Sequence, residues 1–134
     1  MNLVINTQGF SDFINITDLV KQAIKRKNIL NGLVFLFVKG TTAGLALIED
    51  EKGHLEDLKE VLEQIAPSDK NYQHHHNGYD HNGAAHIKAA FLKQDLVIPL
   101  TNGDLELGSW QNIFLIDVDD KPRQREIVVQ IISL

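Results

Sequence analysis

Histidine is concentrated in one short stretch of this chain. Five of the six histidines lie between His74 and His86. Neutral imidazole is a common protein ligand for zinc and related metals, and a metal site needs several donor atoms that converge on one point. The chain has no cysteine, so thiolate sites are excluded and any other donors are carboxylates, carbonyls or water. The stretch therefore predicts a site for a divalent metal, zinc or magnesium.

Spacing alone does not say which histidines would be ligands. No HExxH-type pattern is present, and the adjacent histidines 74–76 cannot all point to one ion. We expect one of these three to act together with His86 from the following helix, and His81 stays open. The alternative interpretation is a solvated loop that binds nothing.

Two sets of carboxylates could complete such a site. Residues 49–51 (Glu-Asp-Glu) end a predicted strand and lead into a helix, where acidic side chains also favour the positive end of the helix dipole. Glu49 could instead be a ligand or general base facing the histidine loop. Asp57 lies at the edge of an apolar stripe, and we expect it to be solvated.

An anion could bind where the helix after the loop begins. Free backbone N–H groups at Asn82 and Gly83, reinforced by His86 and Lys88, would suit a phosphorylated small molecule. Lys88 could equally be exposed to solvent. Trp110, the only tryptophan, is expected to be a core or interface anchor.

The elements that must position these residues follow from apolar periodicity and turn signals. The long polar segment 68–82 is a loop, and loops of this length usually carry function. The run LVFLFV at 33–38 suggests a central strand covered on both faces. Further strands are expected at 2–7, 12–16, 42–48, 96–100, 105–107, 112–118 and 126–132.

Three helices are expected between these strands. The first opens at Thr17 and Asp18, the second spans 55–65 before Pro67, and the third follows Asn82 with Ile87, Ala90 and Phe91 facing inward. Asn102-Gly103 is a strong hairpin signal. The order predicts one α+β domain over residues 1–134, a sandwich with a mainly antiparallel sheet.

Bulk properties narrow the function further. The formal net charge of −5 argues against nucleic-acid binding, which needs clustered Lys and Arg. No apolar run approaches the length of about 20 residues that spans a bilayer, so no membrane association is expected. The N-terminus lacks the features of a signal peptide, which leaves the cytoplasm as the expected compartment.

Four patches resemble the YjbQ family, whose members are often described as thiamine-phosphate synthases. They are Phe37–Gly53, Leu55–Pro67, Asn82–Leu92 and Ile98–Ile131, and their order matches the family across nearly the whole chain. The stretch LELGSWQ, similar to the family's LxLGTWQ, is the most specific. The resemblance implies a YjbQ-like α+β sandwich and a homotrimer, with a metal site near the histidines.

The resemblance also assigns roles to individual positions. His86 matches the histidine of the family's AHxK or SHxR motif, and His74 matches the one two residues after Tyr72. Glu49 and Asp57 match acidic positions. Gly40 departs from the family, because many members carry HTTA where this chain reads GTTA. Glycine offers no ligand or proton-transfer group, which weakens any activity inferred from the HTTA members.

Three hypotheses follow. In the first, a thiamine-phosphate synthase-like transferase uses His74, His86 and Glu49 as metal ligands, with His86, Lys88 and Glu49 as catalytic residues and Asn82-Gly83 at the phosphate. In the second, the same site binds a metal or a phosphorylated metabolite without catalysis. In the third, the chain is an interaction module in which Trp110 or the strand at 33–38 is buried between subunits.

Overall fold

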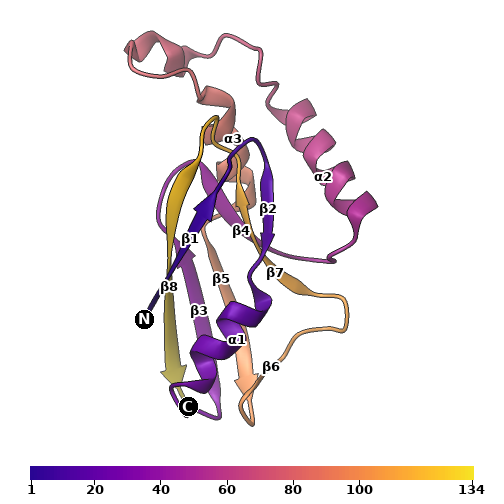
Figure 1. The fold of residues 1–134 in the computed structure, drawn as a ribbon, viewed down its shortest axis with the longest axis vertical. Helices are drawn as coiled ribbons and strands as arrows, with labels where there is room; N and C mark the ends of the chain where they lie inside the picture. Colours follow the sequence, from indigo (N-terminus) through magenta and orange to yellow (C-terminus); the bar gives the residue numbers. More distant parts are fainter.

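Every strand of the protein pairs antiparallel with its neighbours, in two sheets (Figure 1). The computed structural model describes all residues, 1–134. The five-stranded sheet has the order β1 (Asn2–Thr7), β8 (Arg123–Ser133), β3 (Gly32–Val38), β5 (Asp95–Thr101), β6 (Asp104–Leu105). The three-stranded sheet has the order β2 (Asp12–Asn15), β7 (Asn112–Asp117), β4 (Ala43–Ile48). The predicted α+β class with mainly antiparallel sheets is confirmed.

The main core lies between the two sheets. Alternate residues of β3 (Val34, Leu36) and of β7 (Ile113, Leu115) meet there, and α1 (Thr17–Lys25) closes the core with Val20 and neighbouring apolar residues. Figure 1 shows α1 at one end of the sheets and α2 (Lys52–Ile65) at the other side of the molecule. These layers are held together because both sheets bury the apolar side chains of their inner faces.

A second, smaller core forms on the outer face of the three-stranded sheet. Phe114 and Ile116 of β7 project to this face, where Leu62 of α2 and Ala85 and Ala89 of α3 (Gly83–Leu92) cover them. The short 3₁₀ helix η1 (Gln73–Asn77) lies in the segment that connects α2 to α3. No helix is both long enough and apolar enough to cross a bilayer.

The strand that is covered on both faces is β7 rather than β3. Residues from Ile113 to Asp117 are all buried, whereas β3 buries only alternate residues. Leu33, Phe35 and Phe37 face away from the core, with the Phe35 and Phe37 rings stacked 6.5 Å apart. The prediction of a central strand at 33–38 is confirmed, but the prediction that both its faces are covered was wrong, because no helix covers the outer face of the five-stranded sheet and the apolar side chains there stay partly exposed.

Helix α3 turns the opposite face inward from the one predicted. Ile87, Ala90 and Phe91 are exposed, and small residues such as Ala85 and Ala89 contact the sheet. Alanine at the contact lets the helix lie close to β4, where even a methyl group added to Gly44 would meet the Leu92 side chain at 2.6 Å. The hairpin prediction is confirmed, with Asn102 and Gly103 both at positive φ between β5 and β6.

Candidate functional site

The structure brings His74 and His86 together. His74 lies in η1 and His86 in the first turns of α3, and their ring centroids are 4.4 Å apart. Asp80, from the turn between these elements, places Oδ1 2.7 Å from His74 Nε2. The connecting loop therefore folds back on the helix, and two imidazoles and one carboxylate form a cluster that we call the histidine cluster (His74, Asp80, His86).

Burial and neighbouring charges shift the pKa values of two members of this cluster. Burial lowers the pKa of His86, and the neighbouring His74 lowers it further, so the His86 ring is neutral at neutral pH. For Asp80, partial burial favours the neutral acid, but hydrogen bonds from His74 and Asn77 outweigh it and lower the pKa of the carboxyl. The cluster thus combines a neutral imidazole with an ionised carboxylate.

Asn82 connects the cluster to the interior. It precedes α3 and is buried, with Oδ1 3.2 Å from His74 Nε2 and Nδ2 donating to Asp119 Oδ1 at 3.1 Å. Asp119 is fully buried and also accepts hydrogen bonds from Arg123 Nε and from Thr42 Oγ1. Burial would raise the pKa of Asp119, but the bonds from Asn82 and Arg123 dominate and hold it well below its usual range.

Asp119 belongs to a larger group of buried polar side chains, which we call the buried network (Thr7, Thr42, Asp117, Asp119, Arg125). Arg125 binds Asp117 with two hydrogen bonds, Nε to Oδ2 at 2.7 Å and Nη2 to Oδ1 at 3.1 Å. Its Nη2 also donates to Thr42 Oγ1 at 2.7 Å. No buried side-chain nitrogen or oxygen of the protein lacks a partner. The network is therefore a satisfied, rigid support beneath Asn82.

The other histidines of the stretch have different environments. His75 Nε2 accepts the backbone N–H of Gly83 at 3.1 Å, and its ring lies edge-on to Tyr72. His81 is exposed with its ring 4.9 Å from that of His75. His76 is exposed and makes no side-chain hydrogen bond. Of residues 74–76, only His74 therefore lies beside His86.

Glu49 is not part of the cluster. It follows the end of β4 where Ile48 pairs with Asn112, whereas Thr42, which contacts Asp119, precedes the opposite end. At about 3.3 Å per residue, the length of β4 puts roughly 20 Å between the two ends. Within one chain the carboxylate beside the histidines is thus Asp80, not Glu49. Asp57 is exposed on α2, as expected.

Two of the groups that the sequence suggested for an anion at the start of α3 already have partners. The backbone N–H of Gly83 donates to His75, while the Asn82 side-chain amide, rather than its backbone N–H, donates to Asp119. Lys88 is buried rather than free, with Nζ 2.7 Å from Glu63 Oε1 and 3.3 Å from Ser68 Oγ. The contact between Lys88 and Glu63 therefore links α3 to the end of α2, and the Glu63 carboxylate already compensates the charge of Lys88.

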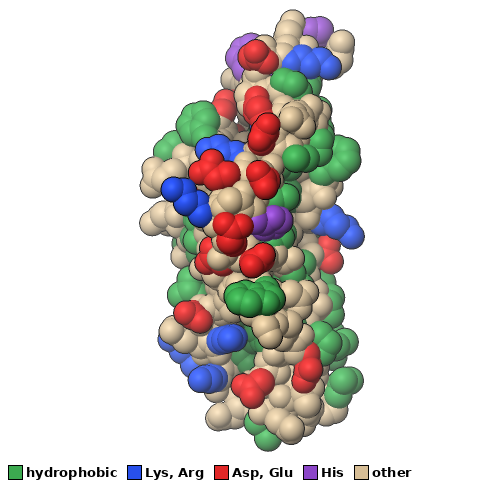
Figure 2. Space-filling model, turned by 90° about the vertical axis from the view of Figure 1, so that its right-hand side faces the viewer, with side chains coloured by type: hydrophobic (Ala, Val, Ile, Leu, Met, Phe, Trp, Pro, Cys, Tyr) green, Lys and Arg blue, Asp and Glu red, His purple; other side chains and the backbone are tan.

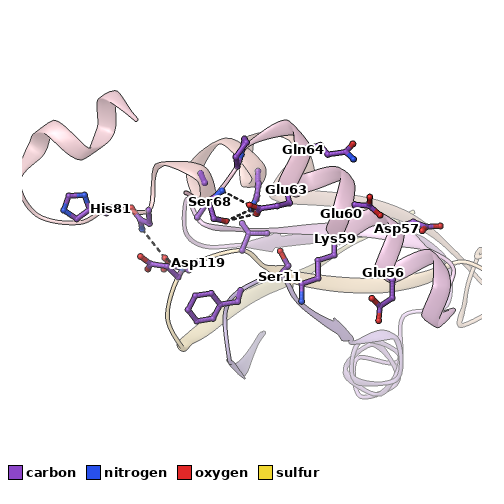
Figure 3. Close-up of a pocket in the computed structure, with 18 residues that line it drawn as sticks. Ser11, Glu56, Asp57, Lys59, Glu60, Glu63, Gln64, Ser68, His81 and Asp119 are labelled. Atoms are coloured by element: carbon purple, nitrogen blue, oxygen red, sulfur yellow. Dashed lines mark hydrogen bonds and ion pairs between the residues drawn. The ribbon is translucent and has the colours of Figure 1, made fainter. Parts of the chain in front are cut away.

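A cleft of about 850 Å³ opens beside these residues, between α2, α3 and the turns at Ser11 and Asp119. Figure 3 shows Lys59 and Glu56 directed from α2 toward Ser11, with Asp119 and His81 at the other end. Acidic side chains gather along the face of the molecule that carries α2 (Figure 2). The cleft is thus lined mainly by polar and acidic groups.

Sequence reasoning missed Asp80, Asp117, Asp119 and Arg125. Asp80 lies in the same polar loop as His74, so its proximity to the histidines was a usable signal. Asp117 ends an otherwise apolar strand, and such a carboxylate needs a buried partner. Nothing in the sequence identified Arg125 as that partner, because the contact depends on how β7 and β8, which belong to different sheets, pack against each other.

Comparisons with known proteins place the chain in a family. The model of the family "UPF0047 protein YjbQ-like" matches residues 1–134. A UPF0047 protein of Archaeoglobus fulgidus is 36% identical over 130 residues, covering 97% of this chain and 98% of the relative. A UPF0047 protein of Mycobacterium tuberculosis is 38% identical over 112 residues, covering 83% and 82%.

Solved structures agree with this placement. The crystal structure of a YbjQ-like protein from Sulfolobus solfataricus has a TM-score of 0.92 at 32% identity, covering 100% of this chain and 96% of that one. A YjbQ/UPF0047 protein from Clostridium acetobutylicum gives a TM-score of 0.89 at 31% identity, covering 98% and 99%. Sequence and fold thus agree over the full length, and the chain belongs to the YjbQ-like UPF0047 family.

Proposed function

We propose that this protein is a metal-site protein in which His74, Asp80 and His86 bind one divalent metal ion. The observation that supports this most is the contact between the His74 and His86 rings, 4.4 Å apart, with the Asp80 carboxylate 2.7 Å from His74. Three protein ligands with a fourth position open to water or substrate is the arrangement of catalytic zinc sites.

The donor set fits zinc or a related transition metal better than magnesium. Two imidazoles with one carboxylate suit transition metals, while magnesium prefers oxygen ligands and retains several waters. As the side chains stand, no group of three His, Asp or Glu converges closely enough to hold an ion. Small side-chain rotations in this half-exposed cluster would have to accompany binding, because Asp80, Asn77 and Asn82 all contact the same His74 nitrogen, Nε2.

Metal content of the untagged protein tests this proposal. Elemental analysis after dialysis is expected to give about one zinc-class ion per chain. His86→Ala, His74→Ala and Asp80→Asn are each expected to remove it. The matched controls are His54→Ala on α2 and His76→Ala on the same loop, which retain it. A wild-type protein that takes up no metal after incubation with zinc contradicts the proposal.

A transferase resembling thiamine-phosphate synthase is the second candidate, favoured by the cleft that shares Asn82 and His81 with the cluster region. In such a reaction a metal would stabilise the departing pyrophosphate. This chain would have to bind the pyrophosphate without Lys88 and Glu49. Lys88 is paired with Glu63, and Glu49 follows the far end of β4. The rival hypothesis is a non-catalytic protein that binds a metal or a phosphorylated metabolite, and Gly40 favours it.

Genetic complementation separates the two candidates. Expression of the wild-type chain in a thiamine auxotroph lacking thiamine-phosphate synthase restores growth only if the chain is a transferase. The His86→Ala variant, produced at the same level, must then fail to restore it. If neither the wild-type chain nor the His86→Ala variant restores growth, while the purified wild-type protein retains its metal, the result favours the non-catalytic binding protein.

A homotrimer is the assembly that we propose, on the basis of the resemblance and of one uncovered surface. The outer face of the five-stranded sheet is apolar: Val4 is 61% exposed, Val97 51% and Ile132 57%, beside Phe35 and Phe37. A patch of this kind usually marks an interface. Light scattering is expected to give three times the chain mass, and Phe37→Glu to reduce it. A monomer at micromolar concentration contradicts the trimer.

A further inference from the structure

The turn between β3 and β4 carries backbone donors without acceptors. The N–H groups of Gly40, Thr41 and Thr42 make no hydrogen bond to any backbone oxygen, and no side chain accepts from them either. Thr42 is only 5% exposed. Gly40 and Thr41 are exposed and their N–H groups can bond to bulk water, but a buried N–H without a partner is rare in folded proteins, so the Thr42 donor requires a bound water or a ligand.

A buried guanidinium ends beside the same turn. Arg125 is 7% exposed, and Asp117 and Thr42 take up its Nε and Nη2, leaving Nη1 without a protein acceptor. A Cβ added to Gly40 would lie 2.8 Å from Nη1, and no atom outside Arg125 would lie within 4 Å of it. Nη1 therefore borders a space that exists because residue 40 has no side chain.

We propose that this turn and Arg125 form a binding site for an oxyanion group, a phosphate or a carboxylate of a small-molecule ligand. Consecutive backbone N–H groups in a turn are a recurrent way to hold an anion, and a guanidinium adds charge-assisted hydrogen bonds. Because Asp117 already compensates most of the charge of Arg125, the amides of Gly40, Thr41 and Thr42 carry much of the recognition.

The oxyanion site is separate from the histidine cluster but connected to it. Thr42 Oγ1 donates to Asp119, Asp119 accepts from Asn82, and Asn82 contacts His74. The donors at residues 40–42 and Arg125 include none of the proposed metal ligands, so the inference does not depend on the proposed metal site. A protein that binds an oxyanion here and no metal refutes one proposal and supports the other.

A titration followed by NMR tests the site directly. Inorganic phosphate is added to ¹⁵N-labelled wild-type protein in the presence of a chelator, at constant ionic strength set with sodium chloride, and acetate is added in a parallel series. Saturating shifts are expected at the amides of residues 40–42 and at the Arg125 side chain. The anion that saturates at the lower concentration identifies the group. No saturating change at these signals with either anion overturns the proposal, as does an equal response at the basic run 25–27.

A matched pair of glycine variants provides the control. Gly40→Ala places a methyl group against Nη1 and is expected to weaken anion binding by about tenfold or more, the loss expected for a charge-assisted hydrogen bond. Gly103→Ala imposes a comparable left-handed strain, but its methyl group would meet only Leu30 at an ordinary 3.5 Å, so binding should be unchanged. Gly40→Ala that is folded and binds like the wild type overturns the proposal. If Gly40→Ala does not fold, the wild-type titration decides.

Discussion

Two polar regions of this protein meet at Asn82, and they are built differently. The buried network joins residues far apart in the sequence, such as Thr7 with Asp117 and Thr42 with Arg125. The histidine cluster joins residues of one loop and the helix that follows it. The network is almost fully removed from solvent, whereas His74 and Asp80 are more than a third exposed.

This difference suggests that the buried network supports the structure, whereas the histidine cluster is the region suited to chemistry. Ion pairs at nearly zero exposure, with every fully buried side-chain polar atom satisfied, hold their geometry because leaving a buried partner unpaired costs several kcal/mol. A half-exposed cluster on a loop can change side-chain rotamers at little cost, which a site that exchanges a proton for a metal or water requires. The network therefore fixes where Asn82 lies, and the cluster retains freedom to bind.

The largest effect is expected for the network. Asp117→Ala leaves Arg125 buried without its carboxylate and should lower the free energy of unfolding by about 3–5 kcal/mol. Urea denaturation followed by circular dichroism measures it. Asp117→Asn keeps the shape and should cost less. The matched substitution Asp80→Ala, in the cluster, should change stability far less. Equal losses for Asp80→Ala and Asp117→Ala would show that the two regions do not differ as argued.

The contrast also explains which parts of the protein were readable in the sequence. Local sequence patterns predicted the strands, the three helices and the Asn102-Gly103 turn, because apolar periodicity and turn chemistry act over a few residues. They also placed one of residues 74–76 near His86, since these residues lie in one loop-helix unit, and the family resemblance identified it as His74. Partners distant in the sequence, such as Thr7 for Asp117 and Thr42 for Arg125, depend on how the two sheets pack and were not readable.

The predictions of which apolar faces are buried failed for a related reason, because they too depend on parts of the chain that are distant in the sequence. The run at 33–38 is as apolar as β7, yet only β7 has helices on its second face. Ile87 and Phe91 of α3 were expected to face inward, but the close approach to β4 places small residues such as Ala85 and Ala89 at the contact. Whether an apolar side chain is covered is decided by the partner layer, which a single sequence does not reveal.

Asn82 should give the next largest effect, since it belongs to both regions. Asn82→Ala leaves Asp119 short of one hydrogen bond and is expected to cost about 1–3 kcal/mol of stability. It should also weaken metal binding, because His74 loses the group that orients it. Urea denaturation and zinc titration calorimetry measure the two losses. Asn71→Ala, at an exposed position of the same loop without a side-chain hydrogen bond, is the control and should leave stability nearly unchanged.

Within the cluster region, adjacent histidines should behave differently. His75→Ala removes the acceptor of the Gly83 N–H at the start of α3 and should cost about 1 kcal/mol, as loss of a helix cap does. His76→Ala, at an exposed position without hydrogen bonds, should stay within about 0.5 kcal/mol. Thermal unfolding of the two variants side by side measures this. Equal destabilisation would mean that the loop is held as one unit.

The smallest effect is expected for the Lys88–Glu63 pair, which is intermediate between the two regions. Lys88 is buried, while the Glu63 side chain is 49% exposed, so solvent screens the pair. Burial alone would raise the pKa of Glu63, but the hydrogen bonds from Lys88 and Ser68 outweigh it and lower the pKa from 4.5 to about 2. A depressed pKa means that the folded protein releases this proton more readily than the unfolded chain does. The pair therefore stabilises the fold above pH 4.5, and this contribution is lost as the pH falls toward 2.

Urea denaturation at several pH values should show wild type more stable than Glu63→Gln at neutral pH, with the difference shrinking below pH 4.5. A difference that stays constant down to the lowest pH at which both proteins fold would mean that the ion pair contributes nothing, and that Ser68 alone holds the end of α2.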